Sequence, residues 1–432
     1  MTRHLPLSCR YLAFAISCFV CACVFGDDAD WPQWRGPHRD GHAAPQSLMN
    51  EWETGGPKVK WSFNDAGVGY SAFSIVGDRL YTMGSRGYDC FTICLNADDG
   101  KMVWQTITSR SSNENDYAHG WGGGPRATPT VDGDFVYSLS DVGVLACLNR
   151  HDGKLIWSAD FVNQFNGAIP KWGYSESVLV DGDRVVGTPG GSSFMVGFDK
   201  ADGHRVWSSQ DAKEAAQYVS IIKHDFAGKS LYITASKTGL IGIHADSGKT
   251  LFKNSSTGND VAVIPTPIAS DNLIYHTSDY NAGNTLLSLS EKDSVIDVEV
   301  VYHLSAKSMQ NHHGGVVLVD GVIYGFTKAG GGDWMAQDFK SGETLWTEKI
   351  RPNRSGSITY ADGRLYCYND EDGSVILVEP SRDGWKNRGE LKLPSKTQIA
   401  RGSGAIWAHP TIANQTLYLR DQDLIFAFDI AK

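Results

Sequence analysis

One short pattern repeats along this 432-residue chain and constrains its fold more than any other feature. It consists of a polar turn, a glycine and an aromatic residue four positions later, as in Gly100 and Trp104. The polar residue favours a tight turn, and glycine supplies the positive φ that a turn with a bulge requires. Apolar alternating runs flank each copy, so each copy predicts a β-hairpin. The other pairs are Gly153 with Trp157, Gly203 with Trp207, Gly248 with Phe252, and Gly342 with Trp346.

A second recurring turn sets the period of the repeat. Upstream of each hairpin a short polar turn joins two apolar runs, as Gly77-Asp78 does between 74–76 and 79–81. Successive turns lie 42 to 56 residues apart, which leaves room for about four short strands in each unit. Eight hairpin-paired units predict an all-β chain folded as an eight-bladed β-propeller. The turns are centred on Gly77, Gly133, Gly182, Gly228, Asn272, Gly321, Gly363 and Asn414.

The two ends of the repeat region predict how the ring closes. The last unit ends with the apolar run 424–430 and is one strand short, while an unpartnered run, 59–63, precedes the first unit. Trp61 stands in that run where Trp104 and Trp157 stand in theirs. We expect the N-terminal strand to complete the eighth blade, because an unclosed ring would expose an open edge. The recurring aromatic side chain is expected to pack between neighbouring blades.

The start of the chain predicts a secretory signal peptide. Two arginines and no acidic residue precede the apolar run 11–25, which is too short to span a bilayer comfortably. Small residues favour cleavage before Asp27, so the protein is expected to be exported to the periplasm or the cell exterior. The alternative is a membrane-anchored lipoprotein acylated at Cys23, because the residues around Cys23 loosely resemble a lipobox.

Three segments are therefore expected. A signal peptide covers 1–26, a lead-in segment covers 27–58, and an eight-bladed propeller covers 59–432. The lead-in is rich in turn-forming residues and contains Trp31 and Trp34, which we interpret as anchors at the edge of the core.

The charge balance excludes one class of partner. Without the first 26 residues, 37 basic residues remain against 49 acidic residues, a net charge of −12. The phosphate backbone of a nucleic acid would be repelled without a dedicated basic stripe, and the sequence shows none. Nucleic-acid binding is not expected.

The cysteines do not predict a disulfide framework. Cys90 and Cys94 lie four residues apart in one expected strand, about 13 Å by the rise per residue and too far for a disulfide. Cys94 and Cys147 occupy equivalent places in neighbouring units, and Cys367 stands alone. Buried, unpaired cysteines are the expected outcome.

The axis of the predicted ring holds the candidate binding residues. The innermost strand of each blade lines the axis, so the segments that lead into these strands meet at one mouth of the central channel. A polar and aromatic concavity there predicts ligand or partner binding. The alternative is a narrow channel in which these groups satisfy one another and ordered water. The candidate ligand-binding residues are Tyr70, Arg126, Tyr174, Glu176, His312, His313, Arg354, Trp407 and His409.

Neither a metal site nor a catalytic residue is assigned. His119, His312, His313 and His409 could approach one another and hold a transition metal, but His312 and His313 would point to opposite faces of an extended segment. The Asp-rich hairpins lack the twelve-residue loop and terminal glutamate of a calcium-binding loop, and are interpreted as solvated turns. No G-x-S-x-G, H-E-x-x-H or P-loop motif is present.

The repeat of aspartate, Gly-Lys, and a tryptophan four residues after the glycine resembles the tryptophan-docking repeat of PQQ-type (pyrroloquinoline-quinone-type) propellers. These include quinoprotein alcohol dehydrogenases and the BamB-like propeller lipoprotein of outer-membrane β-barrel assembly. The resemblance covers roughly 59 to 430 and implies an eight-bladed ring. Two units depart from it, since 288–294 lacks the glycine and Trp385 comes too early. The runs 172–177, 311–315 and 417–423 are also similar to a group of secreted bacterial PQQ-binding-like repeat proteins.

The resemblance also implies what a redox site would need. Quinoprotein dehydrogenases typically hold PQQ between a tryptophan and a disulfide of adjacent cysteines, with calcium bound by carboxylate and amide groups. No two cysteines are adjacent here, so no catalytic residue is transferred. Trp121, Trp334 or Trp407 would supply an aromatic floor, and Glu176 a calcium ligand or base.

Two functions remain open. The first is a non-catalytic, extracytoplasmic binding or scaffold propeller, which takes a protein partner or a small molecule at its mouth. The BamB-like resemblance adds outer-membrane association to that expectation. The second is a PQQ- and calcium-dependent oxidoreductase of the alcohol or sugar dehydrogenase type, in which the cofactor performs the redox chemistry.

Overall fold

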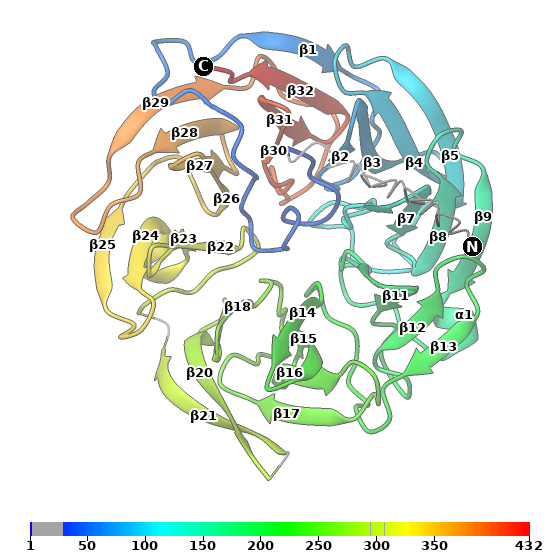
Figure 1. The fold of residues 1–432 in the computed structure, drawn as a ribbon. Helices are drawn as coiled ribbons and strands as arrows, with labels where there is room; N and C mark the ends of the chain where they lie inside the picture. Colours follow the sequence, from blue (N-terminus) through cyan, green and yellow to red (C-terminus); the bar gives the residue numbers. More distant parts are fainter. Residues whose placement is uncertain (2–28, 294, 306) are drawn as a thin grey trace.

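Eight four-stranded antiparallel sheets stand radially around one axis (Figure 1). The computed structural model describes residues 1, 29–293, 295–305 and 307–432. The expected signal peptide and Cys23 lie outside the described residues. The predicted all-β, eight-bladed propeller is confirmed.

The strands follow one another from the axis to the rim within each blade. Blades one and two hold β2 (Ser74–Val76), β3 (Arg79–Arg86), β4 (Asp89–Asn96), β5 (Met102–Arg110), β6 (Thr130–Asp132), β7 (Phe135–Leu139), β8 (Val144–Asn149) and β9 (Leu155–Asp160). Blades three and four hold β10 (Leu179–Asp181), β11 (Arg184–Gly187), β12 (Val196–Asp199), β13 (Arg205–Ser208), β14 (Ile222–Phe226), β15 (Lys229–Ser236), β16 (Gly239–His244) and β17 (Thr250–Asn254).

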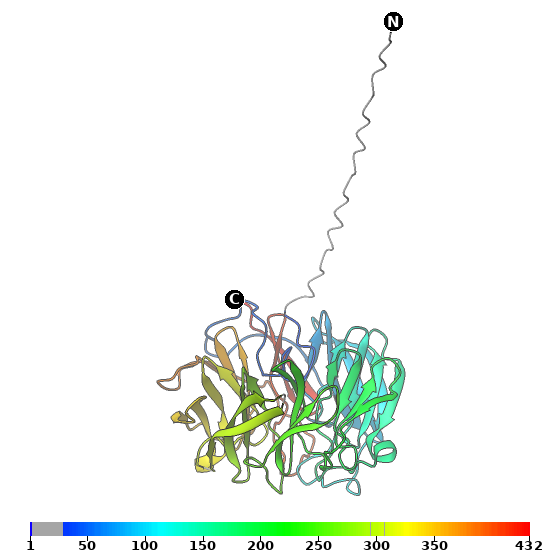
Figure 2. The ribbon, with the colours of Figure 1, turned by 60° about the horizontal axis from the view of Figure 1, so that its bottom comes forward.

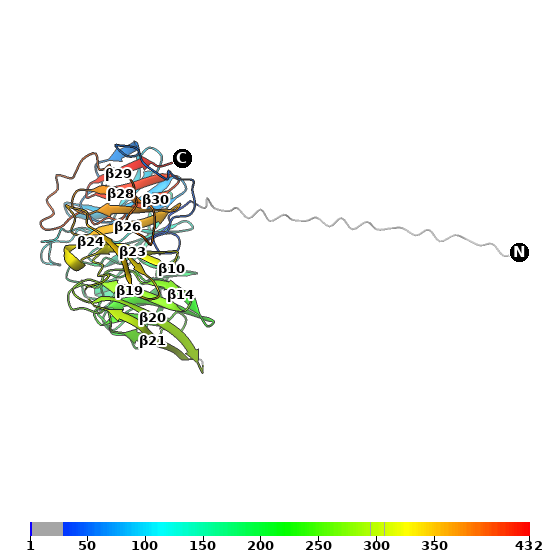
Figure 3. The same ribbon diagram turned by 90° about the vertical axis from the view of Figure 1, so that its left-hand side faces the viewer.

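The second half of the ring repeats this order. Blades five and six hold β18 (Ile268–Ser270), β19 (Leu273–Ser278), β20 (Gly283–Lys292), β21 (Val295–Leu304), β22 (Val316–Val319), β23 (Val322–Thr327), β24 (Asp333–Asp338) and β25 (Thr344–Glu348). Blade seven holds β26 (Gly356–Ala361), β27 (Arg364–Asn369), β28 (Ser374–Val378) and β29 (Asn387–Lys392). The hairpin of β20 and β21 extends beyond the rim (Figures 1 and 3).

Two short helices occur in the described part of the chain, α1 (Phe161–Phe165) and the 3₁₀ turn η1 (Ala329–Gly331). Neither has the length and apolar character that crossing a membrane requires. Figure 2 shows the blades following one another around the ring, with the C-terminus at one face.

The two ends of the repeat region meet in the eighth blade, as predicted. Its strands, from the axis outward, are β30 (Thr411–Ala413), β31 (Thr416–Asp421), β32 (Leu424–Asp429) and β1 (Val59–Phe63). β1 pairs antiparallel with β32, and Trp61 lies opposite Ala427. The N-terminal strand therefore closes the ring by supplying the outermost strand of the last blade (Figure 1).

Each recurring tryptophan joins its own blade to the next one. The Trp61 indole Nε1 donates a hydrogen bond to the Ala97 carbonyl oxygen at 2.8 Å, and Trp104 Nε1 donates to the Arg150 carbonyl oxygen at 3.0 Å. A Cβ built on Gly100 would lie 2.5 Å from the Trp61 ring. The glycine is thus the surface on which the indole of the preceding blade packs. Equivalent bonds run from Trp157 to Lys200, from Trp207 to Asp246, and from Trp346 to Ser381.

Blade five keeps this contact with a different residue. The Tyr302 hydroxyl donates to the Phe339 carbonyl oxygen at 2.9 Å, and the Tyr302 ring lies against Gly342. The sequence pattern missed this unit because its own turn has no glycine. In blade four the equivalent Phe252 has no polar atom and contributes packing alone within an apolar cluster.

All four cysteines in the described residues are buried and unpaired, which confirms that expectation. Cys94 lies opposite Trp104, and Cys147 lies opposite Trp157, at equivalent places in adjacent blades.

The lead-in segment crosses one end of the central channel. Trp31 exchanges two backbone hydrogen bonds with Ile75 of β2, and Pro32 accepts one from Val131 of β6. The Gly41 carbonyl oxygen accepts from Tyr360 of β26. Figure 1 shows this segment lying over the axis. The lead-in segment therefore connects the innermost strands of separate blades through backbone hydrogen bonds.

Two buried arginines fix the lead-in to further blades. The Arg35 guanidinium donates to the Val316 carbonyl oxygen, and that of Arg39 to the carbonyl oxygens of Ser177 and Val178. Burial lowers the pKa of Arg35 to about 10 and that of Arg39 to about 9, so both remain charged near neutrality. Hydrogen bonds to these backbone carbonyl oxygens stabilise the two buried guanidinium groups.

A matched pair of glycine substitutions tests the docking contact. Gly153 and Gly133 both have positive φ, at 73° and 55°, but a Cβ on Gly153 would lie 2.6 Å from the Trp104 ring, whereas Gly133 faces open space. Both alanine variants should lose about 1 kcal/mol through left-handed backbone strain. Gly153→Ala should lose about 2 kcal/mol more, because the indole is displaced. Urea unfolding of both variants measures the difference, and equal losses would contradict the docking role of Gly153.

Candidate functional site

A cavity of about 310 Å³ lies at the mouth formed by the segments that lead into the innermost strands. Its walls are mainly aromatic. The lining residues are Trp34, Tyr70, Trp121, Arg126, Lys171, Trp172, Ser175, Tyr218, Val261, Ala262, Ile264, Tyr280, His312, His313, Trp407 and His409.

The lead-in segment supplies the floor of the cavity. Trp34 Nε1 donates to the Thr266 hydroxyl at 2.9 Å, and the Trp34 ring lies 4.5 Å from the His409 ring. Trp31 is 3% exposed and is a core anchor as expected, whereas Trp34 lines the cavity. The lead-in therefore contributes to the lining of the cavity through Trp34.

Three aromatic rings form one wall. The Trp407 ring lies 5.2 Å from the Tyr70 ring and 6.3 Å from the Trp121 ring, and the two indoles are inclined by 24°. Trp121 is 45% exposed, so its ring stands at the rim. Burial raises the pKa of Tyr70, whose hydroxyl donates to the Trp121 carbonyl oxygen at 3.1 Å.

The Arg126 side chain is held in place by neutral groups. Its guanidinium donates to the Gly122 carbonyl oxygen at 2.7 Å, the Gly124 carbonyl oxygen at 3.0 Å and the Tyr117 hydroxyl at 3.2 Å. The same guanidinium lies 5.2 Å from the centre of the Tyr70 ring. These contacts fix the cation without neutralising it.

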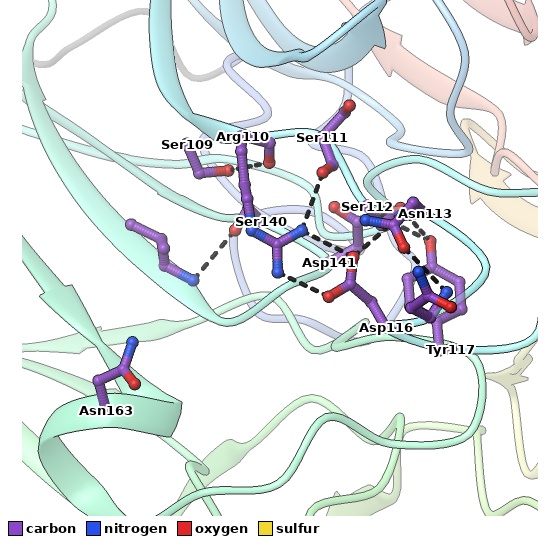
Figure 4. A network of polar contacts seen from close by, with 12 residues as sticks. Ser109, Arg110, Ser111, Ser112, Asn113, Asp116, Tyr117, Ser140, Asp141 and Asn163 are labelled. Atoms are coloured by element: carbon purple, nitrogen blue, oxygen red, sulfur yellow. Dashed lines mark hydrogen bonds and ion pairs between the residues drawn. The ribbon is translucent and has the colours of Figure 1, made fainter.

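A polar network behind the mouth positions Tyr117 (Figure 4). The Tyr117 hydroxyl donates to the buried Asp141 carboxylate at 2.6 Å, and Ser112 Oγ donates to the same oxygen at 2.5 Å. Arg110 pairs with Asp116 through two contacts of 2.6 Å. The network ties the segment after β5 to the turn between β7 and β8 of the second blade, and through Tyr117 it orients Arg126.

Three histidines also line the cavity, and two of them, His312 and His313, lie beside the Trp407 ring. His312 Nε2 shares a hydrogen bond of 3.1 Å with the Tyr280 hydroxyl, and His313 Nδ1 shares one of 2.9 Å with Ser355 Oγ. His409 Nε2 donates to the His313 carbonyl oxygen at 3.0 Å. Burial lowers the pKa of His312 to about 4 and that of His409 to about 3, and holds the pKa of His313 well below its usual value. The imidazoles are therefore neutral near pH 7.

Six of the nine candidate binding residues line this one cavity, and three lie elsewhere. Tyr174 is buried within blade three, where its hydroxyl donates to the Pro189 carbonyl oxygen at 2.9 Å. The Glu176 carboxylate is buried and accepts from the Thr188 backbone N–H. Arg354 pairs with Glu371. The six lining residues are Tyr70, Arg126, His312, His313, Trp407 and His409.

Between Tyr174 and Glu176 lies Ser175, which does line the cavity. Its two neighbours are held away from the cavity by their own contacts, with Pro189 and Thr188. Burial raises the pKa of Glu176 to about 7, while the nearby Arg39 partly opposes that shift.

The expectation that only one of His312 and His313 faces the axis is wrong, because both line the cavity. Residues 310–315 belong to no strand, so the alternation of an extended segment does not apply there. His119 does not join them. It packs at 4.5 Å from the Tyr117 ring and lines a separate, polar cavity.

Sequence reasoning did not nominate several lining aromatics, chiefly Trp34, Trp172, Tyr218 and Tyr280. Trp172 and Tyr218 lie directly before innermost strands, so the rule that found Tyr70 and Trp407 could have found them as well. Tyr280 lies in the turn between β19 and β20, with φ of 60°, and no repeat marker pointed to it.

The cavity does not fit a calcium–quinone pair. Calcium prefers carboxylate and carbonyl oxygens, but the lining contains no aspartate or glutamate. The cysteines of the described residues lie buried in the blades, away from the lining. In the same residues, one cluster has three metal-binding groups within reach of one another, Asp199, Asp202 and His204, on an exposed hairpin turn. The cavity histidines form no such cluster.

Comparisons with known proteins agree with this architecture. Residues 91–348 match the family described as outer membrane protein assembly factor BamB. The outer membrane protein assembly factor BamB of Yersinia pestis is 23% identical over 288 residues, which cover 66% of this chain and 58% of that relative. The match therefore spans less than two thirds of that relative's length.

Two solved structures are similar in fold. BamB from Moraxella catarrhalis has a TM-score of 0.59 at 12% identity, covering 86% of this chain and 99% of that chain. Quinohemoprotein alcohol dehydrogenase from Comamonas testosteroni has a TM-score of 0.65 at 11% identity, covering 94% of this chain and 81% of that one. At such low sequence identity, these two similarities establish a shared fold and nothing about function.

Eight four-stranded blades with indoles docked across several blade boundaries define a β-propeller of the PQQ-like repeat class. Since the matched family covers more than half of the sequence, the chain belongs to the outer membrane protein assembly factor BamB family.

Acidification should destabilise the protein. His276, His312, His313 and His409 have pKa values lowered by burial, so the unfolded chain binds more protons than the native one below about pH 6.5. The free energy of unfolding should therefore fall as the pH drops from 6.5 toward 4.

Glu176 opposes this trend, because its raised pKa of about 7 favours the native state at low pH. Thermal unfolding between pH 7 and 5 should therefore show a lower midpoint on acidification, and a steeper decline in Glu176→Gln. A midpoint that rises on acidification would contradict this reasoning.

Proposed function

We propose that this chain is a non-catalytic, exported binding propeller that takes up a small organic ligand at its mouth. The aromatic cavity of about 310 Å³, which Trp34 of the lead-in helps to line, carries this proposal. Recessed, mainly apolar cavities with a few placed polar groups are the usual form of small-molecule sites. The lining comes from segments far apart in the sequence, so the closed ring and the lead-in are both needed to form it.

A self-satisfied channel accounts less well for the same residues. Groups that only satisfied one another would leave little room between them, whereas here the lining encloses a volume large enough for a small organic molecule. Trp121 at 45% exposure presents much of a large apolar ring to solvent at the rim. Such exposure is typical of surfaces that bind something.

A protein-docking role is the second candidate, and the family supports it. The relative from Yersinia pestis is named an outer membrane protein assembly factor, and that name indicates a protein that acts together with other proteins at the outer membrane. Export of this chain and its association with the outer membrane are supported by the same name and by the sequence pattern of the first 26 residues. A partner could insert an aromatic side chain into the mouth cavity.

Two exposed aromatics allow a matched test. Trp121 lines the cavity, whereas Tyr88 is 91% exposed and lies outside the lining. Trp121→Ala should weaken binding of an aromatic ligand about tenfold, because one ring contact is lost, and Tyr88→Ala should leave binding unchanged. Tryptophan fluorescence and calorimetry with a panel of one- and two-ring aromatic compounds measure both. If no compound binds the wild-type protein, the small-ligand proposal fails.

The oxidoreductase alternative has its own assay. Purified protein incubated with PQQ and calcium should not oxidise alcohols or sugars in a dye-linked assay, because the lining offers no carboxylate for the ion. Oxidation that requires both PQQ and calcium would overturn the non-catalytic assignment.

A further inference from the structure

The charged side chains that line the cavity are both cations. Arg126 and Lys171 contribute to the lining, and no aspartate or glutamate does. This composition runs against that of the whole chain, whose net charge is −10. The excess of positive charge is therefore local to the mouth and does not follow from the overall composition.

Within the described residues, neither cation forms an ion pair with a carboxylate. Carbonyl and phenol oxygens accept the hydrogen bonds of Arg126, and Lys171 Nζ lies 4.8 Å above the Trp172 ring. In the described part of the chain, the ion pairs join other arginines, lysines and histidines to carboxylates. A guanidinium fixed in position with no carboxylate partner is suited to an anionic ligand group.

Two further buried nitrogens on the cavity residues lack partners. Neither Trp407 Nε1, an N–H donor, nor His313 Nε2 has a hydrogen-bond partner among the described residues. An indole N–H is a donor only, and a buried donor without an acceptor destabilises the structure that contains it. The rings of Trp407 and His313 lie 5.4 Å apart, so one acceptor-bearing group could approach both after a small side-chain adjustment.

The walls favour a flat ligand. Trp121 and Trp407 are inclined by 24° with their centres 6.3 Å apart, and Tyr70 lies beside Trp407. Aromatic faces bind other planar rings through offset or edge contacts. A cavity of about 310 Å³ has room for one or two fused rings.

We propose that the mouth binds a planar organic anion, an aromatic carboxylate of one or two rings, with its carboxylate directed to Arg126 and Lys171. This inference rests on the proposed small-ligand function and adds the charge and shape of the ligand. The positive lining attracts the anion, and the indole rings contact its aromatic face.

A pair of probes isolates the charge. Indole-3-acetate and indole-3-acetamide share the same ring, but only the acid carries a negative charge at pH 7. Calorimetry on the full-length protein in low salt should show the acid binding at least about tenfold more tightly than the amide, because the cations add charge-assisted hydrogen bonds. Raising the salt concentration should weaken binding of the acid and leave that of the amide unchanged.

Charge variants locate the effect. Arg126→Gln should weaken binding of the acid about tenfold, and Arg126→Lys should recover part of that loss because the positive charge is kept. The exposed Lys171→Gln should weaken it about threefold, and folding should not depend on that side chain. Lys154→Gln removes a charge from an exposed hairpin turn outside the lining and should change nothing.

The outcomes separate the two proposals. If acid and amide bind equally well, or if Arg126→Gln and Lys171→Gln both leave binding of the acid unchanged, the anion assignment is wrong while small-ligand binding stands. If neither probe binds and no neutral aromatic compound binds, both proposals fail.

Discussion

The contact between an indole and a glycine turn of the next blade holds this ring together. Each docked indole buries a large apolar surface and satisfies its N–H on a carbonyl oxygen across the blade boundary, as Trp61 does on Ala97. Because the glycine has no Cβ, the ring can approach its backbone closely. The same contact joins the eighth blade to the first, so closure and inter-blade packing depend on one kind of interaction.

Closure of the ring creates the site at its centre. The inner strands bring short segments from all around the chain to one mouth, and the lead-in crosses the channel and places Trp34 beneath them. The charges of Arg35 and Arg39 are accepted by backbone carbonyls in or directly before inner strands, which makes the lead-in part of the wall. The cavity is thus a product of the whole architecture.

The sequence predicted the parts of the fold that repeat. Turn glycines and the aromatic four residues later located the hairpins, and the unpaired run around Trp61 predicted the closing strand, which pairs with β32. The sequence pattern did not identify Tyr302, because the turn of its own blade lacks the marker glycine. In addition, a phenol takes the docking position that an indole occupies in most other blades.

The site was predicted less completely, because its residues lie in irregular segments. The rule of segments before inner strands identified Tyr70, Arg126 and Trp407, which line the cavity. It could not tell which of two neighbours faces the axis, so it chose Tyr174 and Glu176, whereas Ser175 lines the cavity. Nor could it place the side chain of Trp34, which reaches the mouth only because the lead-in crosses the channel.

The pairing of β1 with β32 has a consequence for biosynthesis. The strand around Trp61 is the first part of the ring to leave the ribosome, and its partner is among the last. Contacts between such distant parts of a chain form slowly, because a long loop must be closed before they are made. One edge of the nascent ring therefore stays unpaired until the strand of the last blade that covers it has been synthesised.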